Sequence, residues 1–295
     1  MKNRGVYLGL ILATILLVFG VWVLSFFGST LTIKRVAMDS EAAAKKVAVP
    51  SSQAFFNPPR PEDAPESIRA EVMLGYKIMT QTSKYAAEYV GKDSKLSCSS
   101  CHFDGGRSME SFSLVGVGAT YPRYRDRNEY TVDLGIRIQG CFDRSMNGTP
   151  PPLDGQIIQS LLVYLQWISK DIPIYAKLPW AVPESMENPH KPDVANGEKV
   201  YKDVCARCHG PNGEGTDIAP PVWGGDSYND GAGMHRVRTL GIFAWRFMPK
   251  NAPSLTQEEA LDVAGYIHEQ PRPKFVSTHP DKIERLIPLT EGKQP

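Results

Sequence analysis

The sequence has almost no net charge, which excludes one broad class of function. Its 33 Lys and Arg residues are offset by 32 Asp and Glu residues, giving a formal charge of +1. Such a chain has no global attraction for nucleic acid or for acidic membranes, so any binding of an anion must be local. Cysteine is also scarce, with five residues among 295. Four of the five lie in two copies of a motif that uses both of its cysteines, so one is left over and no disulfide within the chain is expected.

The repeated motif is Cys-x-x-Cys-His. Two cysteines three positions apart can each bond one vinyl group of a porphyrin, while the histidine takes one axial position on the iron. This is the attachment signature of c-type haem, and two matches make chance or a zinc half-site a poor explanation. The sequence therefore predicts two covalently bound haem c groups and a redox function. The cofactor-binding residues are Cys98, Cys101 and His102 in the first copy, and Cys205, Cys208 and His209 in the second.

The N-terminal segment, 1–29, predicts a membrane anchor. Met1 to Arg4 carries two positive charges, and the run from Gly5 to Gly28 contains no charged residue. As a helix this run covers about 35 Å, enough to cross the hydrocarbon layer of a bilayer. A cleaved signal peptide is the alternative, but its apolar region is normally about 7–15 residues long. Because the positive N-terminus stays in the cytoplasm, the chain is expected to be anchored in the inner membrane with its catalytic domains in the periplasm.

Each motif is preceded by one predicted helix and followed, after a long loop, by another. Segment 196–204 precedes the second motif, and apolar helices are predicted at 157–168 and 256–268, the last starting with a capping box of Thr256 and Glu259. Before the first motif, apolar residues recur about every four positions after Pro65, which predicts an amphipathic helix. These residues are Ile68, Val72, Tyr76 and Met79.

These elements predict an all-α fold of two cytochrome c-type haem domains after an N-terminal transmembrane helix. The length of the chain supports two domains, because 295 residues are enough for each domain to bury its own core. The expected segments are a membrane anchor at 1–29, a tether at 30–64, a cytochrome c domain with the active-site haem at 65–172, a proline-rich linker at 173–192, and an electron-transfer cytochrome c domain at 193–295.

The sixth iron ligand of a cytochrome c domain comes from the loop region after the motif. Met248 lies in that region after His209, and Pro249 fixes the backbone beside it. A core methionine is the alternative interpretation. With histidine and methionine as ligands the iron has a raised potential, so the second haem is expected to accept and relay electrons.

Cys141, the cysteine left over, follows His102 at the same separation in sequence at which Met248 follows His209. A free cysteine is most often a small buried apolar residue, but at this position its thiolate can bind iron. Met146 is the competing ligand and would make the protein an ordinary electron carrier. The equal spacing favours Cys141 as the iron ligand and as a catalytic residue.

Six arginines lie near Cys141 or the first motif in the sequence. Charged residues most often form a solvated surface, and Asp126 and Glu129 could pair with some of these. A planar guanidinium suits oxyanions, however, and several near a reactive sulfur would form a site for a small dianion. The six are Arg107, Arg123, Arg125, Arg127, Arg137 and Arg144, of which Arg107, Arg123 and Arg144 are the first choices as catalytic residues.

Several segments resemble the dihaem thiosulfate dehydrogenase family. The resemblance covers roughly residues 65–273, and the stretch around Cys141 is its most specific part. The segments that carry it are LSCSSCH at 96–102, YPRYR at 121–125, RIQGCFDRSMNG at 137–148, PPVWG at 220–224, GAGM at 231–234 and VAGYI at 263–267.

The resemblance implies a reaction and a set of ligands. In that family the first haem is ligated by histidine and cysteine, and the second by histidine and a methionine or lysine. Its members join two thiosulfate ions into tetrathionate and release two electrons, and some run the reverse reaction. For this chain it implies that arginines hold thiosulfate against Cys141 and the first iron. Electrons would then pass from the first haem to the second, and on to a soluble cytochrome or a terminal oxidase.

The chain departs from the family pattern in two places. Most members are soluble in the periplasm, whereas this chain has an apparent anchor. Phe247 stands where some members have a lysine before the methionine ligand, so a ligand switch using that lysine is not available.

Two other functions stay open. A membrane-tethered electron-transfer cytochrome c without its own substrate would need methionine or histidine on both irons and no anion site. A physiological tetrathionate reductase would use the same residues in the reverse direction, which the sequence does not separate from thiosulfate oxidation.

Overall fold

The computed structural model describes residues 56–181, 185–186 and 190–276. The expected anchor at 1–29 and most of the expected tether lie outside these ranges. Within them, no helix combines the length and the apolar character that crossing a bilayer requires.

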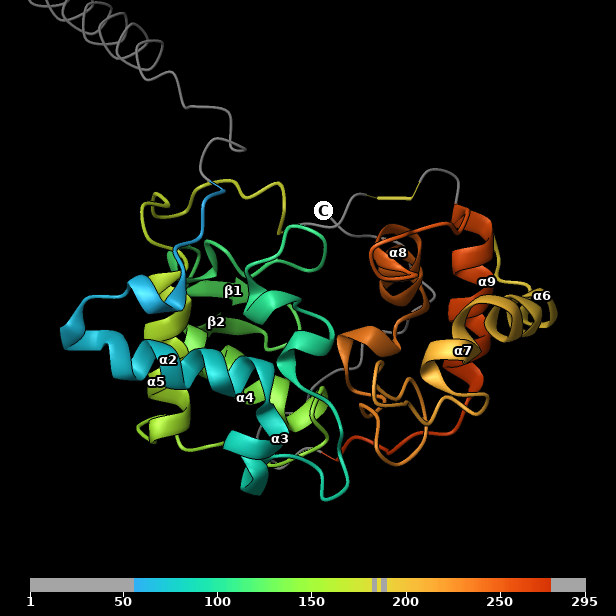
Figure 1. Cartoon of the computed structure of the whole chain (residues 1–295), viewed down its shortest axis with the longest axis horizontal. Coiled ribbons are helices and arrows are strands. Elements are labelled where there is room, and N and C mark those ends of the chain that lie inside the picture. The colour runs from blue at the N-terminus through green and yellow to red at the C-terminus, as the bar shows by residue number, and fades with distance from the viewer. Residues whose placement is uncertain (1–55, 182–184, 187–189, 277–295) are drawn as a thin grey trace, which may run out of the picture. The chain divides into compact units, whose positions relative to one another are not determined.

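The N-terminal half of the described chain is mostly helical (Figure 1). Helices α2 (Glu66–Thr80) and α3 (Thr82–Tyr85) precede the first motif, and α4 (Leu134–Arg144) and α5 (Gln156–Trp167) follow it. The predicted helices before the motif and at 157–168 are therefore confirmed. Helix α4 was not predicted, and it is the element that carries Cys141.

A small hairpin departs from the expected all-α fold. Strand β1 (Arg123–Arg125) pairs antiparallel with β2 (Tyr130–Val132), and Arg123 lies opposite Val132. Directly after β2, the Asp133 carboxylate accepts a hydrogen bond from the backbone N–H of Ile136 (2.8 Å) and caps α4. The hairpin therefore continues without a loop into α4.

The core of the N-terminal half lies where α2 crosses α5. Val72 of α2 and Leu161 and Tyr164 of α5 are almost completely buried there. The crossing requires glycine at position 75, because a Cβ at Gly75 would collide with the backbone carbonyl of Ser160. This close packing fixes the position of α2. Helix α3, which follows it directly, contacts the first motif.

The C-terminal half has a similar plan. Its helices are α6 (Val194–Val200), α7 (Ala206–His209), α8 (Val237–Phe247) and α9 (Gln257–Glu269). A π-helical turn, Tyr201–Cys205, joins α6 to α7, so the predicted helix at 196–204 continues into the second motif.

Helices α6 and α9 cross as closely as α2 and α5. A Cβ at Gly197 would collide with the backbone carbonyl of Asp262. The predicted capping box at the start of α9 is confirmed, because Thr256 Oγ1 accepts from the N–H of Glu259 and the Glu259 carboxylate accepts from the N–H of Thr256.

Aromatic and core contacts are among those that join the halves. Phe103 and Phe112, beside the first motif, pack against Phe243 and Phe247 of α8 with ring centroids 5.3 to 6.1 Å apart. In addition, Tyr228 of the C-terminal half lies in the hydrophobic core of the N-terminal half. Elements of the C-terminal half thus contribute to the surroundings of the first motif.

Candidate functional site

The first motif is held by the first residue of α3, Thr82. Thr82, which is fully buried, accepts a hydrogen bond from the backbone N–H of Cys98 (3.0 Å). Residues Cys98–Ser100 form one helical turn with reciprocal capping by Ser97 and Ser100. Burial raises the pKa of Cys98 to about 11 and that of Cys101 to about 12. Both thiols are therefore neutral and lie in surroundings that suit the apolar edge of a porphyrin.

Both motif histidines are oriented in the same way. His102 Nδ1 donates to the backbone carbonyl of Phe112, and His209 Nδ1 donates to that of Pro220 (2.7 Å). Because a carbonyl can only accept, Nδ1 carries the proton and the Nε2 lone pair is available for a metal. Burial lowers the pKa of both imidazoles, to about 4 for His102. Both rings are therefore neutral at pH 7, which is the form that binds iron.

Cys141 belongs to the same site as the first motif. In addition to burial, the charge of Cys141 raises the pKa of both Cys98 and Cys101, so its sulfur lies within electrostatic reach of the two attachment cysteines. Arg137, one helical turn earlier on α4, donates a hydrogen bond from Nη1 to the Cys141 sulfur (2.7 Å). The guanidinium therefore lies in direct contact with this sulfur, which also lies 3.6 Å from the backbone carbonyl of Arg137.

Met146, the competing ligand, is 3% exposed and packs within the hydrophobic core of the N-terminal half. Core packing accounts for its burial without a metal. The choice of Cys141 over Met146 as the ligand of the first iron stays a prediction.

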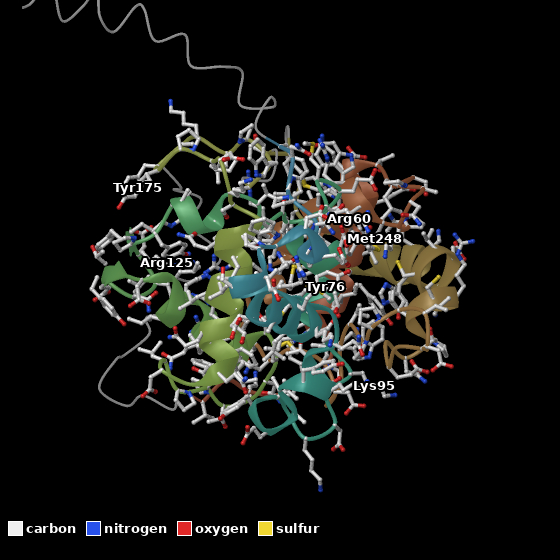
Figure 2. All side chains as sticks on the ribbon, turned by 60° about the vertical axis from the view of Figure 1, so that its left-hand side comes forward. Arg60, Tyr76, Lys95, Arg125, Tyr175 and Met248 are labelled. Atoms are coloured by element: carbon white, nitrogen blue, oxygen red, sulfur yellow. The ribbon has the colours of Figure 1, made fainter. Side chains whose placement is uncertain are left out.

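A second arginine, Arg125, which is labelled in Figure 2, lies within electrostatic reach of Arg137. Arg125 Nη1 donates to the Tyr121 hydroxyl (2.9 Å), and Tyr121, with a smaller effect than Cys141, also raises the pKa of Arg137. Cys141 raises the pKa of Arg137, whereas burial and the charge of Arg137 lower the pKa of Arg125. The larger contributions to the pKa of the two arginines come from burial, Cys141, Tyr121 and neighbouring arginines. A small dianion beside Cys141 would neutralise this positive charge.

The local sequence explains how these groups meet. Arg137 and Cys141 are four residues apart on one helix, so they share a face. Arg125 ends β1, and the hairpin leads directly into α4. The four-residue spacing is a signal that could have singled out Arg137 from the sequence. No comparable signal distinguishes Arg125 from Arg123 or Arg127, because their surroundings depend on their tertiary neighbours.

Two of the arginines favoured from the sequence have other contacts. Arg123 is exposed, and its guanidinium lies 5.4 Å from the centre of the Tyr121 ring. Arg144, at the end of α4, lies 5.8 Å from the ring of Phe275. Neither contact involves Cys141, and the substrate-binding role of both arginines stays a prediction.

The second motif spans the π-helical turn and α7. Burial raises the pKa of Cys205 to about 12, as it does for the cysteines of the first motif. Met248 is half-buried directly after the last residue of α8, at the position labelled in Figure 2. Its ligation of the second iron stays a prediction.

The residues of both motifs fit covalently attached haem. Each motif offers two thiols and a neutral imidazole whose Nε2 is available. Arg107, in the loop after the first motif, is the third favoured arginine, and it pairs with Asp104 at 3.3 Å. Its Nε is buried without a hydrogen-bond partner in the described part of the chain. A buried guanidinium donor of this kind suits a carboxylate such as a haem propionate.

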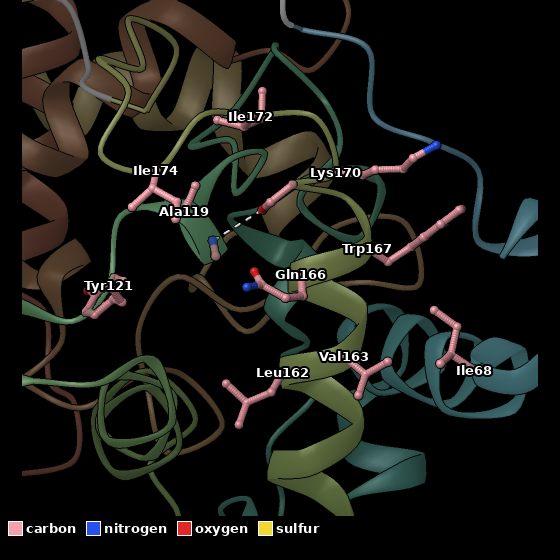
Figure 3. Close-up of a pocket in the computed structure, with 12 residues that line it drawn as sticks. Ile68, Ala119, Tyr121, Leu162, Val163, Gln166, Trp167, Lys170, Ile172 and Ile174 are labelled. Carbon is pink, nitrogen blue, oxygen red and sulfur yellow. Dashed lines mark hydrogen bonds between the residues drawn. The ribbon is translucent and has the colours of Figure 1, made fainter. Parts of the chain in front are cut away.

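A groove of about 710 Å³ runs along α5 and does not include any residue of the two motifs (Figure 3). Leu162, Val163 and Ile172 are among its mainly apolar lining residues, and Tyr121 lies at one end. The hydrogen bond from Gly118 N–H to Ser169 Oγ (3.2 Å) crosses its wall. An apolar lining does not suit a dianion, so the candidate site is the region around Cys141 and not this groove.

Two family models match the chain. Residues 88–174 match the cytochrome c domain of SoxA/TsdA, and residues 192–267 match subunit III of cbb3-type cytochrome c oxidase. Each match contains one Cys-x-x-Cys-His motif. The chain thus has two cytochrome c domains, which imply covalent haem c.

The chain is similar to thiosulfate dehydrogenases along most of its length. It is 36% identical to that of Stutzerimonas stutzeri over 275 residues, covering 90% of this chain and 88% of the relative. It is 37% identical to that of Thiomonas intermedia, covering 81% and 79%. A solved thiosulfate dehydrogenase from Marichromatium purpuratum is 33% identical, with a TM-score of 0.68 over 75% of this chain. The match covers only half of that longer solved chain.

Proposed function

This chain belongs to the thiosulfate dehydrogenase family, and from that membership we propose that it oxidises thiosulfate to tetrathionate as a dihaem cytochrome c. In this reaction two thiosulfate dianions give one tetrathionate dianion and two electrons. The reaction needs a site for a small dianion, a reactive sulfur and an electron acceptor at one place.

The observation that carries the proposal is the hydrogen bond from Arg137 to the sulfur of Cys141. It places a guanidinium in contact with the cysteine that the two motifs leave unused. Arg125 adds a second positive charge through Tyr121. An electron-transfer cytochrome without a substrate has no need for a charged anion site of this kind.

The two motifs would hold two haem c groups. The residues that would ligate the irons are His102 and Cys141 in the first domain, and His209 and Met248 in the second. When bound, the two haems supply iron centres that each accept one of the two electrons.

The side chains of the site would bind and orient the substrate. Arg125 and Arg137 neutralise the sulfonate end of thiosulfate, which leaves its terminal sulfur toward Cys141. The Cys141 thiolate forms an S–S bond with that sulfur as two electrons leave. A second thiosulfate then attacks the same sulfur, the bond to Cys141 breaks, and tetrathionate departs with the thiolate restored. Neither step gains or loses a proton. Arg107, Arg123 and Arg144 remain proposed contributors to the same positive surroundings.

Location and partners are proposed on a similar basis. Cytochromes c are found outside the cytoplasm, where their haem is attached. The charge-free run from Gly5 to Gly28 supports an anchor in the inner membrane, with domains 65–172 and 193–295 in the periplasm joined by a linker at 173–192. A soluble cytochrome or a terminal oxidase is the proposed electron acceptor.

Steady-state assays on the purified full-length holoprotein test the proposal. With a one-electron oxidant, the wild type should form one tetrathionate for every two thiosulfates, and Cys141→Ala should abolish turnover while the spectrum of the second haem stays unchanged. Faster reduction of tetrathionate than oxidation of thiosulfate would assign the reductase direction. Inactivity of the wild type in both directions would support the electron carrier without a substrate.

A further inference from the structure

A loop of the C-terminal half packs against the end of α4, the helix that carries Cys141. Tyr228 and Ala232 of this loop are 6% and 2% exposed and lie in the core of the N-terminal half. Arg127, from the turn of the hairpin, donates from Nη1 to the backbone carbonyl of Gly231 (3.0 Å). The loop is therefore fixed to the N-terminal half on both sides of Asn229.

Asn229 is 2% exposed, and both its side chain and its backbone make hydrogen bonds. Its Nδ2 donates to the backbone carbonyl of Asp143 (2.9 Å) and to Asn147 Oδ1 (3.1 Å). Its backbone N–H donates to the carbonyl of Arg144 (3.2 Å), and its Oδ1 accepts from the N–H of Gly231 (3.1 Å). A buried amide with this many partners is held in one orientation.

These contacts complete the hydrogen bonding at the end of α4. The last carbonyls of a helix have no partner within the helix and need other donors. The carbonyls of Cys141 and Phe142 accept from backbone N–H groups that follow the helix in the same half. Next, the Asp143 carbonyl accepts from Asn229 Nδ2 of the other half, and the Arg144 carbonyl accepts from the Asn229 N–H and also, at 3.4 Å, from the N–H of Asn147. The final turn of the helix that bears Cys141 is thus capped by the C-terminal half.

We propose that Asn229 is a positioning residue for Cys141. By capping α4 from the other half, it fixes the last turn of the helix and so the reach of the Cys141 sulfur toward the first haem. This inference rests on the proposed function, in which Cys141 ligates that haem. It adds that docking of the C-terminal half fixes the position of Cys141, the proposed iron ligand of the first domain.

The test compares the purified full-length holoprotein with three variants. Asn229→Ala removes the side-chain donors, and Asn229→Asp keeps the shape but places oxygen against the acceptors. Asn196→Ala is the matched control, because Asn196 Nδ2 donates to Asp262 (2.7 Å) within the C-terminal half and does not contact α4. The readouts are the ferric EPR signal of the thiolate-ligated haem, the potential of each haem, and kcat and KM separately.

Both Asn229 variants should reduce the ratio of thiolate-ligated to thiolate-free first haem by about tenfold, since a buried acceptor loses its donor. The kcat should fall with that ratio, while the signal and potential of the second haem stay as in the wild type. Asn196→Ala should change neither haem.

Three results would overturn the inference. The first is an unchanged EPR signal and potential of the first haem in both Asn229 variants. The second is a general defect, seen as equal changes at both haems or as loss of haem from both variants. The third is an effect of Asn196→Ala on the first haem equal to that of Asn229→Ala. Cys141→Ala, measured in parallel, separates this inference from the proposed function. If it leaves the first-haem signal unchanged, Cys141 is not the ligand and the proposed function is wrong at that point. If it removes the signal and the Asn229 variants do not, only the positioning role is wrong.

Discussion

Replacing Arg137 by Gln removes the positive charge closest to the Cys141 sulfur and keeps a side chain that can still donate a hydrogen bond. In the structure Arg137 Nη1 donates to that sulfur at 2.7 Å. A hydrogen bond to a charged group contributes about 1.5–3 kcal/mol. Arg137→Gln should therefore lower kcat/KM for thiosulfate by roughly 10- to 150-fold.

Stopped-flow and steady-state assays of the holoprotein would measure this loss. Arg60→Gln is the matched control, because the Arg60 side chain is 70% exposed and pairs with Glu62 at 3.6 Å. Because the attraction is electrostatic, added salt should lower kcat/KM of the wild type more steeply than that of Arg137→Gln. A value of kcat/KM within twofold of the wild type, with the same salt dependence, would refute the assignment of Arg137 to the anion site.

The remaining predictions concern the second haem, acid stability and helix crossing. Met248→Ala should abolish the weak long-wavelength absorption of a ferric thioether ligand and lower the potential of the second haem; a loss of that band in Met234→Ala instead would transfer the assignment to Met234. Burial alone would raise the pKa of Asp262, but hydrogen bonds, the largest from Asn196, lower it overall. The ionised carboxylate therefore stabilises the fold above its unfolded pKa of about 3.8, and this stabilisation is lost as the pH falls through the lowered folded pKa. Asp262→Asn should lower the free energy of unfolding at pH 7 by about 1–3 kcal/mol. In denaturant titrations at lower pH, the free energy of unfolding of the variant should fall less steeply than that of the wild type, and an equally steep fall would contradict this. Gly75→Ala should destabilise by about 1–3 kcal/mol because its Cβ meets the Ser160 carbonyl, whereas Gly225→Ala, with open space around its Cβ, should not, and equal melting temperatures would refute the close crossing.

The cofactor chemistry could be predicted from the sequence because it is local. Cys98, Cys101 and His102 lie within one short segment, and their spacing alone specifies two thioether bonds and one axial nitrogen. The amphipathic stripe before the first motif and the capping box at Thr256 are equally local, and both are confirmed. The equal spacing after the two motifs also directed attention to Cys141, which the structure places within electrostatic reach of the attachment cysteines.

The choice among the six arginines could not be made from the sequence. Arg123 and Arg125 are two residues apart, yet Arg123 is exposed and Arg125 hydrogen bonds Tyr121 beside Arg137. Residues two apart on a strand lie on the same face, so this difference comes from the tertiary neighbours of each arginine and not from the strand pattern. Helix α4 itself was missed because it is short and includes two glycines and several polar residues, and its end is capped by a partner from the other half of the chain.

The sequence by itself determined where haem is attached and which sulfur is left over, since the attachment motifs depend on residues close together in the chain. Only the tertiary structure decided which charges surround that sulfur and what holds its helix. Arg125 belongs to the hairpin that precedes the helix of Cys141, and Asn229 belongs to the other half of the chain. Contacts between such distant segments follow from the packing of whole elements, which no local pattern of residue types specifies.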